Sequence, residues 1–490
     1  MPLRKDSLRD PASSALDTPV ALATLFYRTA GAPLVSGNDV RVLLDATANY
    51  PAWLSAIEAA QRTIHLEMYI VHNDTVGRRF REALIARAKA GIAVRVLYDW
   101  FGALRPSSLR FWEPLVAAGG EVRVANPPRP DSLLGLFSRD HRKLLTVDSR
   151  IAFISGLCIG EDWLGDPDKG LPPWRDTGVS IEGPAVADAE RAFASAWAVW
   201  GAELPEGTVP AVESLRRAGD VRVRVIPTSP ERSSLYRLEL ALIHVAQERV
   251  WLTDAYFMGT TIYIEALRAA AQNGVDVRLL VPSNSDIAVI ANASRTLYRR
   301  LLDAGVRVFE WDGPMIHAKT AVADGTFVRI GSTNLNLSSW LGNWELDVAI
   351  EDDDVADQMA KIYEQDLTQS TEIVITGRKV RLNPQRQRAR ITHPNLRRGR
   401  VSLAVGGSAN RMVKDVALAG SVIGSAVRGY RVLGPAEAAS LAFFGVVAIL
   451  VAVCAVVWPR MVAWPVAVIA ALVGVTLLVR SVKARSRPRN

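Results

Sequence analysis

Along the first 370 residues, the same order of helix-like and strand-like patterns of apolar and polar positions occurs twice. Residues 56–98 run through a helix-period stretch, a short apolar strand, a second helix, a glycine and an alternating strand, and residues 241–280 repeat this order. Each copy is followed by a helix-end signal, LVAAGGEVRV at 115–124 and LLDAGVRVFE at 301–310. Helices alternating with strands predict an α/β sheet flanked by helices, and two copies predict a pseudo-dimer of repeated α/β/α units.

The C-terminal part has a different pattern. Residues 438–458 are 21 positions without a charge, and residues 461–479 are 19 more. About 20 apolar residues let a helix cross a bilayer core. A helical hairpin buried in a soluble core is the alternative, but such helices normally keep a polar stripe, which neither run has. We therefore expect a transmembrane helical hairpin over 438–480.

Basic residues gather on both sides of that predicted hairpin. Residues 378–400 hold nine Lys or Arg and no acid, and residues 480–490 hold five. Of the chain's 58 basic residues, 44 remain elsewhere against 50 acidic ones. Positive flanks stay on the cytoplasmic side, which predicts a multi-pass protein of the inner membrane with a cytoplasmic N-terminal part. A polybasic stretch there favours anionic lipids as partners over nucleic acid, and is also compatible with a solvated linker.

The patterns divide the chain into six parts. The N-terminus shows no apolar core before a cleavage site, so no signal peptide is predicted. The two cysteines, Cys158 and Cys454, cannot build a disulfide framework. The expected parts are an N-terminal segment 1–36, a first repeat 37–205, a second repeat 206–376, a basic juxtamembrane linker 377–437, the hairpin 438–480 and a basic cytoplasmic tail 481–490.

The chemistry-bearing residues fall in the second half of each repeat. His141, Lys143 and Asp148 fit the pattern H-x-K-x-x-x-x-D, and His317, Lys319 and Asp324 fit it again. On a strand, positions i and i+2 share a face, so each histidine is expected to point with its lysine. Each aspartate has the opposite parity, and Gly325 follows Asp324 as a turn signal, so both aspartates are expected to end a strand and hold its neighbours.

The doubled motif, with Gly331-Ser332-Thr333-Asn334 after its second copy, resembles the phospholipase D superfamily. Over residues 37–370 the chain resembles the bacterial cardiolipin synthases of that superfamily, in tracts such as Asn126-Pro127 and Trp174-Arg-Asp-Thr. The resemblance implies two phospholipase D-like units with one shared active site. It departs from the family at Cys158, where an asparagine is expected, and in placing membrane helices after the catalytic region.

The resemblance implies phosphatidyl transfer through a phosphohistidine. One neutral imidazole attacks phosphorus, and a second, protonated imidazole donates to the leaving oxygen. We expect His141 as the nucleophile, with Lys143, Lys319 and Asn334 holding the non-bridging oxygens. The family also places an acid downstream of each motif to orient its histidine, which points to Asp176 and Glu345. No metal and no cofactor are expected, because histidines and cysteines do not cluster.

The expected reaction joins two phosphatidylglycerols into cardiolipin and glycerol. A phospholipase D that releases phosphatidic acid needs the same residues, so the acceptor stays open. A nuclease is disfavoured by the predicted membrane helices. A non-catalytic membrane scaffold is disfavoured by the intact His141, Lys143, His317 and Lys319.

Overall fold

The computed structural model describes residues 19–103, 109–127, 138–376 and 379–383. Within these ranges no helix combines the length and the apolar character that a membrane crossing requires. The hairpin predicted for 438–480 and the tail 481–490 lie outside the described residues, as do residues 384–437 of the predicted linker. The described residues form two α/β units that share one 16-stranded sheet.

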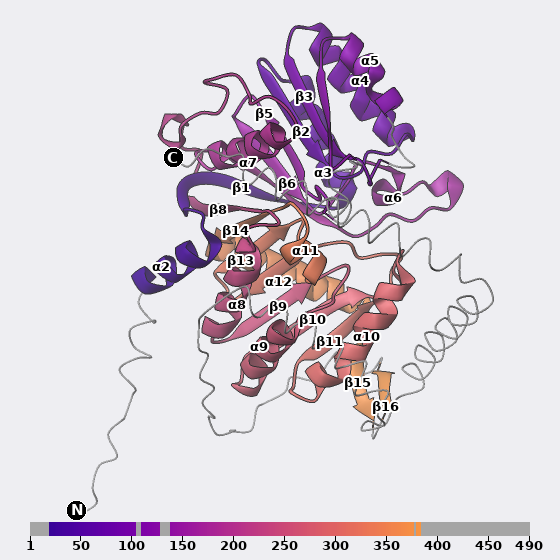
Figure 1. Ribbon diagram of the computed structural model, residues 1–490. Coiled ribbons are helices and arrows are strands. Elements are labelled where there is room, and N and C mark those ends of the chain that lie inside the picture. The colour runs from indigo at the N-terminus through magenta and orange to yellow at the C-terminus, as the bar shows by residue number, and fades with distance from the viewer. Residues whose placement is uncertain (1–18, 104–108, 128–137, 377–378, 384–490) are drawn as a thin grey trace, which may run out of the picture.

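The first unit is built on β1 (Val35–Leu44) through α7 (Val186–Val199), in the upper half of Figure 1. Its strand order is β4-β3-β2-β5-β6-β7-β1, with β2, β3 and β4 parallel and the others antiparallel. The remaining strands are β2 (Thr63–Met68), β3 (Ala93–Asp99), β4 (Glu121–Ala125), β5 (Lys143–Val147), β6 (Ile151–Ser155) and β7 (Thr177–Glu182). The helices are α3 (Asp45–Glu58), α4 (Thr75–Lys89), α5 (Leu109–Ala117), α6 (Glu161–Leu164) and α7.

The second unit repeats this order in the lower half of Figure 1. Its strand order is β8-β14-β13-β12-β9-β10-β11, with β9, β10 and β11 parallel. The strands are β8 (Val221–Thr228), β9 (Arg249–Thr253), β10 (Asp276–Pro282), β11 (Arg307–Trp311), β12 (Thr320–Ala323), β13 (Phe327–Gly331) and β14 (Glu345–Glu351). The helices are α8 (Ser234–Val245), α9 (Thr261–Gln272), α10 (Ala288–Leu302), α11 (Leu337–Leu341) and α12 (Asp353–Thr368). The two predicted repeats are thus confirmed as α/β units.

Two flanking segments join the second unit. Helix α2 (Pro19–Ala30) packs on α8, and Phe26 enters the core there, so part of the expected N-terminal segment belongs to this unit. Strands β15 (Ser370–Thr376) and β16 (Lys379–Asn383) extend the sheet beyond β11. Residues 379–383, expected to begin the linker, therefore pair with β15 instead.

The two units meet through side chains as well as through backbone. Strands β1 and β8 pair only near their starts, where the register shifts. One apolar core draws on both units, with β6, β7 and α7 on one side and β13, β14 and α12 on the other. Burying this shared apolar surface holds the units together. Within each unit the strand that follows the motif histidine pairs with the first parallel strand, β5 with β2 and β12 with β9.

Candidate active site

The two motif histidines lie beside the repeat boundary, each bonded by its backbone to the opposite unit. The His141 N–H donates to the Trp344 carbonyl at 2.9 Å, and the His317 N–H donates to the Arg175 carbonyl at 2.7 Å. Strands β5 and β12 begin only at Lys143 and Thr320. Both histidines therefore lie just before a strand and not within it, because the backbone pairs across the boundary before the strand starts. Both histidines are buried, at 8% and 4% exposure.

Each histidine takes its carboxylate from the other unit. His141 Nδ1 lies 2.9 Å from Glu345 Oε2, and His317 Nδ1 lies 2.7 Å from Asp176 Oδ2. Both acids are fully buried. A carboxylate on Nδ1 fixes the tautomer and leaves Nε2 for the reacting atom. The sequence pointed to both acids, each downstream of its own motif, but the contacts cross between the units.

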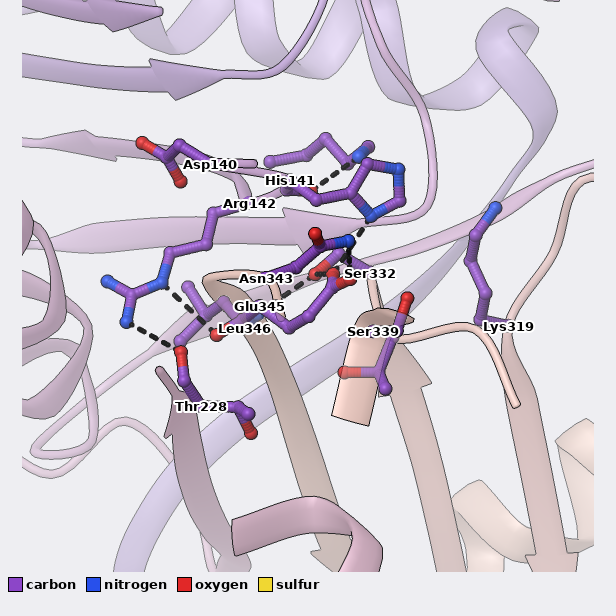
Figure 2. Close-up of polar contacts among 12 residues, drawn as sticks. Asp140, His141, Arg142, Thr228, Lys319, Ser332, Ser339, Asn343, Glu345 and Leu346 are labelled. Atoms are coloured by element: carbon purple, nitrogen blue, oxygen red, sulfur yellow. Dashed lines mark hydrogen bonds and ion pairs between the residues drawn. The ribbon is translucent and has the colours of Figure 1, made fainter. Parts of the chain in front are cut away.

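The Glu345 carboxylate has two further donors, both from the second unit. Ser332 Oγ donates to Oε2 at 2.6 Å and Asn343 Nδ2 to Oε1 at 3.2 Å. Figure 2 shows these side chains converging on Glu345 below His141. Neither residue was singled out as an acid-positioning group from sequence, although Ser332 stood within the Gly-Ser-Thr-Asn tract that was.

The Asp176 carboxylate has different support. Trp163 Nε1 donates to its Oδ2 at 3.2 Å, and the Thr177 N–H donates to its Oδ1 at 2.8 Å. Gly156 takes the place that Ser332 has in the second unit. A Cβ on Gly156 would lie 2.2 Å from Asp176 Oδ1, so this acid requires glycine as its neighbour.

The two lysines stand beside the histidines in matching ways. Lys143 Nζ donates to the His141 carbonyl at 2.5 Å, and Lys319 Nζ donates to the His317 carbonyl. Lys143 Nζ is 5.1 Å from the Tyr69 ring and Lys319 Nζ is 6.0 Å from the Tyr256 ring. The same rings stand edge-on to His141 and His317, at 4.8 and 5.8 Å between centroids. Two buried ammonium groups at one site are suited to an anionic phosphodiester.

Burial sets the protonation of the free site. It lowers the pKa of His141, with Glu345 opposing and Lys143 adding to the shift. Burial, followed by Lys319, lowers the pKa of His317 to about 3. Both imidazoles are thus neutral before substrate arrives. A bound anionic phosphodiester would supply negative charge that raises the pKa of a histidine beside it, so a histidine acting as general acid would gain its proton when substrate binds.

Asp148 and Asp324 hold turns rather than face the histidines. Asp148 accepts the backbone N–H groups of Gln61, Arg62 and Thr63 at 2.7–2.9 Å. Asp324 accepts three N–H groups of residues 247–249 in the same way, at 2.7–2.9 Å. Both aspartates have positive φ, 56° and 48°. These contacts fix the starts of β2 and β9 to the motif hairpins, a structural role.

Asn334 and Cys158 occupy matching positions after β13 and β6. Asn334 is 5% exposed, and its Oδ1 has no hydrogen-bond partner within the described part of the chain. Cys158 is 1% exposed, and burial raises the pKa of its thiol. A neutral thiol is a weak donor, so the first unit lacks the amide that the second offers. Among the described residues no group of three or more His, Cys, Asp or Glu could hold a metal ion.

A duplicated α/β unit with one shared pair of histidines and lysines defines a phospholipase D-like enzyme. The family described as cardiolipin synthase, PLD-like domain, matches residues 53–161 and 240–367, which contain both motifs. The cardiolipin synthase A of Pseudomonas putida (strain W619) is 33% identical over 349 residues, covering 70% of this chain and 71% of that protein. The cardiolipin synthase of Geobacillus sp. (strain WCH70) is 32% identical over 358 residues, or 72% and 70%. The chain belongs to the cardiolipin synthase family.

A solved structure agrees with the fold. The phosphatidylserine synthase of Haemophilus influenzae Rd KW20 covers 75% of this chain and 92% of its own, with a TM-score of 0.55 and 14% sequence identity. At this identity the likeness concerns the fold alone.

Proposed function

We propose that this chain joins two phosphatidylglycerols into cardiolipin and glycerol through a phosphohistidine. The observation that carries the proposal is the pair of buried histidines, each with a carboxylate on Nδ1 and a lysine alongside, in a chain similar to cardiolipin synthases over both units.

In the first half-reaction His141 Nε2 attacks phosphorus, and the bond from phosphorus to the headgroup glycerol oxygen breaks. His317 gives its proton to that oxygen, so glycerol leaves neutral. In the second, His317 takes the proton from a hydroxyl of another phosphatidylglycerol, whose oxygen attacks phosphorus, and the P–N bond to His141 breaks. Lys143, Lys319 and Asn334 hold the non-bridging oxygens in both steps.

Product analysis tests the acceptor. Phosphatidylglycerol labelled in its headgroup glycerol is incubated with the purified protein, and lipids and soluble products are separated. We expect labelled cardiolipin and free glycerol in equal amounts. Phosphatidic acid with glycerol and no cardiolipin would replace the proposal by the second candidate, a hydrolytic phospholipase D, which uses the same residues.

We also propose that the enzyme works at the cytoplasmic face of the inner membrane. The sequence pattern at 438–480 and the basic residues of 378–400 support this. The positions of exposed large apolar side chains also support it. Several of them lie in segments that follow strands on the histidine side of the sheet: Phe101, Leu164, Ile262, Ile287 and Leu337. Exposed apolar residues around a site are typical of a lipid-facing surface.

Two shortened chains test the attachment. A chain ending at Arg400 keeps the nine basic residues and should sediment with anionic vesicles at low salt but not at high salt. A chain ending near Asn383 should lose most of that binding and need no detergent for extraction. Equal binding of the longer chain to neutral and anionic vesicles would contradict the lipid role of the basic segment.

A further inference from the structure

One buried ionic cluster beside His141 has no counterpart in the second unit. It consists of Glu67, Asp140 and Arg142, all at 2% exposure or less. Aligning the two motifs and the strand pairs puts Thr253, Ile316 and Ala318 at the matching positions. A small, largely apolar set therefore suffices for this fold. Buried ion pairs are a poor route to stability compared with well-packed apolar side chains, so the charged version calls for another reason.

Arg142 reaches across the boundary to the backbone of the acid that orients His141. Its Nε donates to the Glu345 carbonyl at 3.1 Å, and its Nη2 donates to the Thr228 carbonyl at 3.3 Å. Its Nη1 donates to the Ala192 carbonyl at 2.9 Å, in α7 of its own unit. Figure 2 shows the guanidinium turned away from His141 and toward Glu345 and Thr228. The Trp344 ring, just before Glu345, lies 5.1 Å from the guanidinium carbon.

Glu67 and Asp140 supply the counter-charge. Arg142 Nη1 lies 3.6 Å from Glu67 Oε1. Apart from their contact with each other and a backbone hydrogen bond from Arg142 to Asp140, the carboxyl oxygens of Glu67 and Asp140 have no hydrogen-bond donor among the described residues. Burial raises the pKa of Glu67 well above its usual range and that of Asp140 to about 7, with Arg142 opposing both shifts. Burial therefore disfavours two negative charges beside the single positive charge of Arg142.

A third carboxyl group, that of Asp99, lies next to the cluster and adds to the raised pKa of Asp140. The Asp99 carboxylate faces Asp140 from β3, but it is bonded to the Asp140 N–H at 2.7 Å and to Asn126 Nδ2 at 3.0 Å. Around Arg142 itself, the guanidinium is held by three backbone carbonyls and lies next to the Glu67 carboxyl. A planar, rigid fork suits such a task, and lysine cannot replace it contact for contact.

We propose that Arg142 is a positioning residue, which holds the start of β14 so that the Glu345 carboxylate meets His141, with Glu67 and Asp140 as its buried counter-charge. The inference rests on the proposed function only for the identity of the lipid. It concerns the chemistry of His141 on any phosphodiester.

The test is a double-mutant cycle between Arg142→Met and Glu345→Gln in the full-length protein. Two reactions are measured, cardiolipin formation from phosphatidylglycerol and hydrolysis of bis(p-nitrophenyl) phosphate. We expect Arg142→Met to lower kcat about tenfold to a hundredfold in both reactions with little change in KM. In the Glu345→Gln background it should lower kcat less than threefold further, because its effect runs through Glu345.

Arg224→Met is the matched control. Arg224 is equally buried, bonds the Ala32 carbonyl and pairs with Glu351, away from the histidines. It should lower Tm without lowering kcat of the folded fraction. If Arg142→Met does not fold, Arg142→Lys enters the same cycle. The double variant Glu67→Gln, Asp140→Asn should lower kcat as Arg142→Met does, and each single variant should lower it much less.

Three results would overturn the proposal: an unchanged kcat in Arg142→Met, an equal loss in both backgrounds, or the same kcat loss in Arg224→Met. Failure of the proposed function looks different. In that case the wild type would hydrolyse the chromogenic diester without making cardiolipin, and the cycle could still be read.

Discussion

The two units of this chain share a scaffold and differ in what surrounds the histidines. Both place a lysine at the histidine carbonyl and an aspartate at the following turn. The first unit has Gly156 and Cys158 where the second has Ser332 and Asn334. Under the proposed mechanism, the duplicated contacts serve the fold and phosphate binding. The divergent contacts then serve the steps in which one histidine attacks phosphorus and the other moves a proton.

The crossed contacts make each histidine depend on an acid of the other unit. Because His141 depends on Glu345 and His317 on Asp176, neither unit contains a complete histidine–acid pair. A change near one acid acts on the histidine of the other unit. The two units therefore form one site, and a substitution near the site in one unit affects the histidine of the other.

Removing either histidine should have the largest effect. His141→Ala and His317→Ala should each lower the rate of cardiolipin formation by about a thousandfold or more, because nucleophile and acid are both needed in one site. His244→Ala, on the exposed side of α8, is the control and should keep full activity. Retention of more than about a tenth of the activity in either catalytic variant would mean that the units work separately.

Exchanging the small residues beside the acids should be strongly unequal. Gly156→Ser puts a Cβ at 2.2 Å from Asp176 Oδ1 and should move this acid off His317, lowering kcat about a hundredfold. Ser332→Gly removes one hydrogen bond to Glu345 and should lower kcat about tenfold. Steady-state kinetics on phosphatidylglycerol, with Tm for both variants, decide the matter. Equal losses of kcat in the two variants would contradict the claim that the two acids are held in different ways.

The pH dependence should show a limb from Lys319. Burial lowers the pKa of Lys319 to about 8, so its ammonium is present below that pH and lost above it. Since the ammonium attracts the anionic phosphodiester, kcat/KM should fall as pH rises through about 8. Lys319→Arg, charged throughout, should be slower but lack this limb. A limb that stays at the same pH in Lys319→Arg belongs to another group.

Restoring the amide in the first unit should have the smallest effect. Cys158→Asn adds a donor beside the lysines and should raise kcat/KM two- to fivefold, less than one full hydrogen bond to a charged group gives. The reciprocal Asn334→Cys should lower it by about tenfold or more. A higher kcat/KM in Asn334→Cys would show that the amide of the second unit does not hold the phosphate.

The periodicity of the sequence predicted the two α/β units correctly because helix and strand patterns are local, whereas the hairpin expected over 438–480 lies outside the described residues. The family resemblance, and not the periodicity, pointed to the two acids, and their role in orienting the histidines stays a prediction that the contacts to Nδ1 support. It did not predict their crossing, which follows from how β7 and β14 start beside the opposite motif. Arg142 and Glu67 were not foreseen either, because they lie far apart in the sequence and meet only when β2 and β5 pair. Among the residues that support the acids, only Ser332 stood in a tract, Gly-Ser-Thr-Asn, that the sequence motif had marked.

The most direct test of one shared site with two unequal histidines is to trap the covalent intermediate. Wild-type protein is mixed with phosphatidylglycerol labelled at phosphorus, quenched within a turnover, digested under alkaline conditions and mapped by mass spectrometry. A shared site predicts at most one label per chain, on His141, with His317 unlabelled. Label on both histidines, or two labels per chain, would contradict it, and label on His317 alone would reverse the roles.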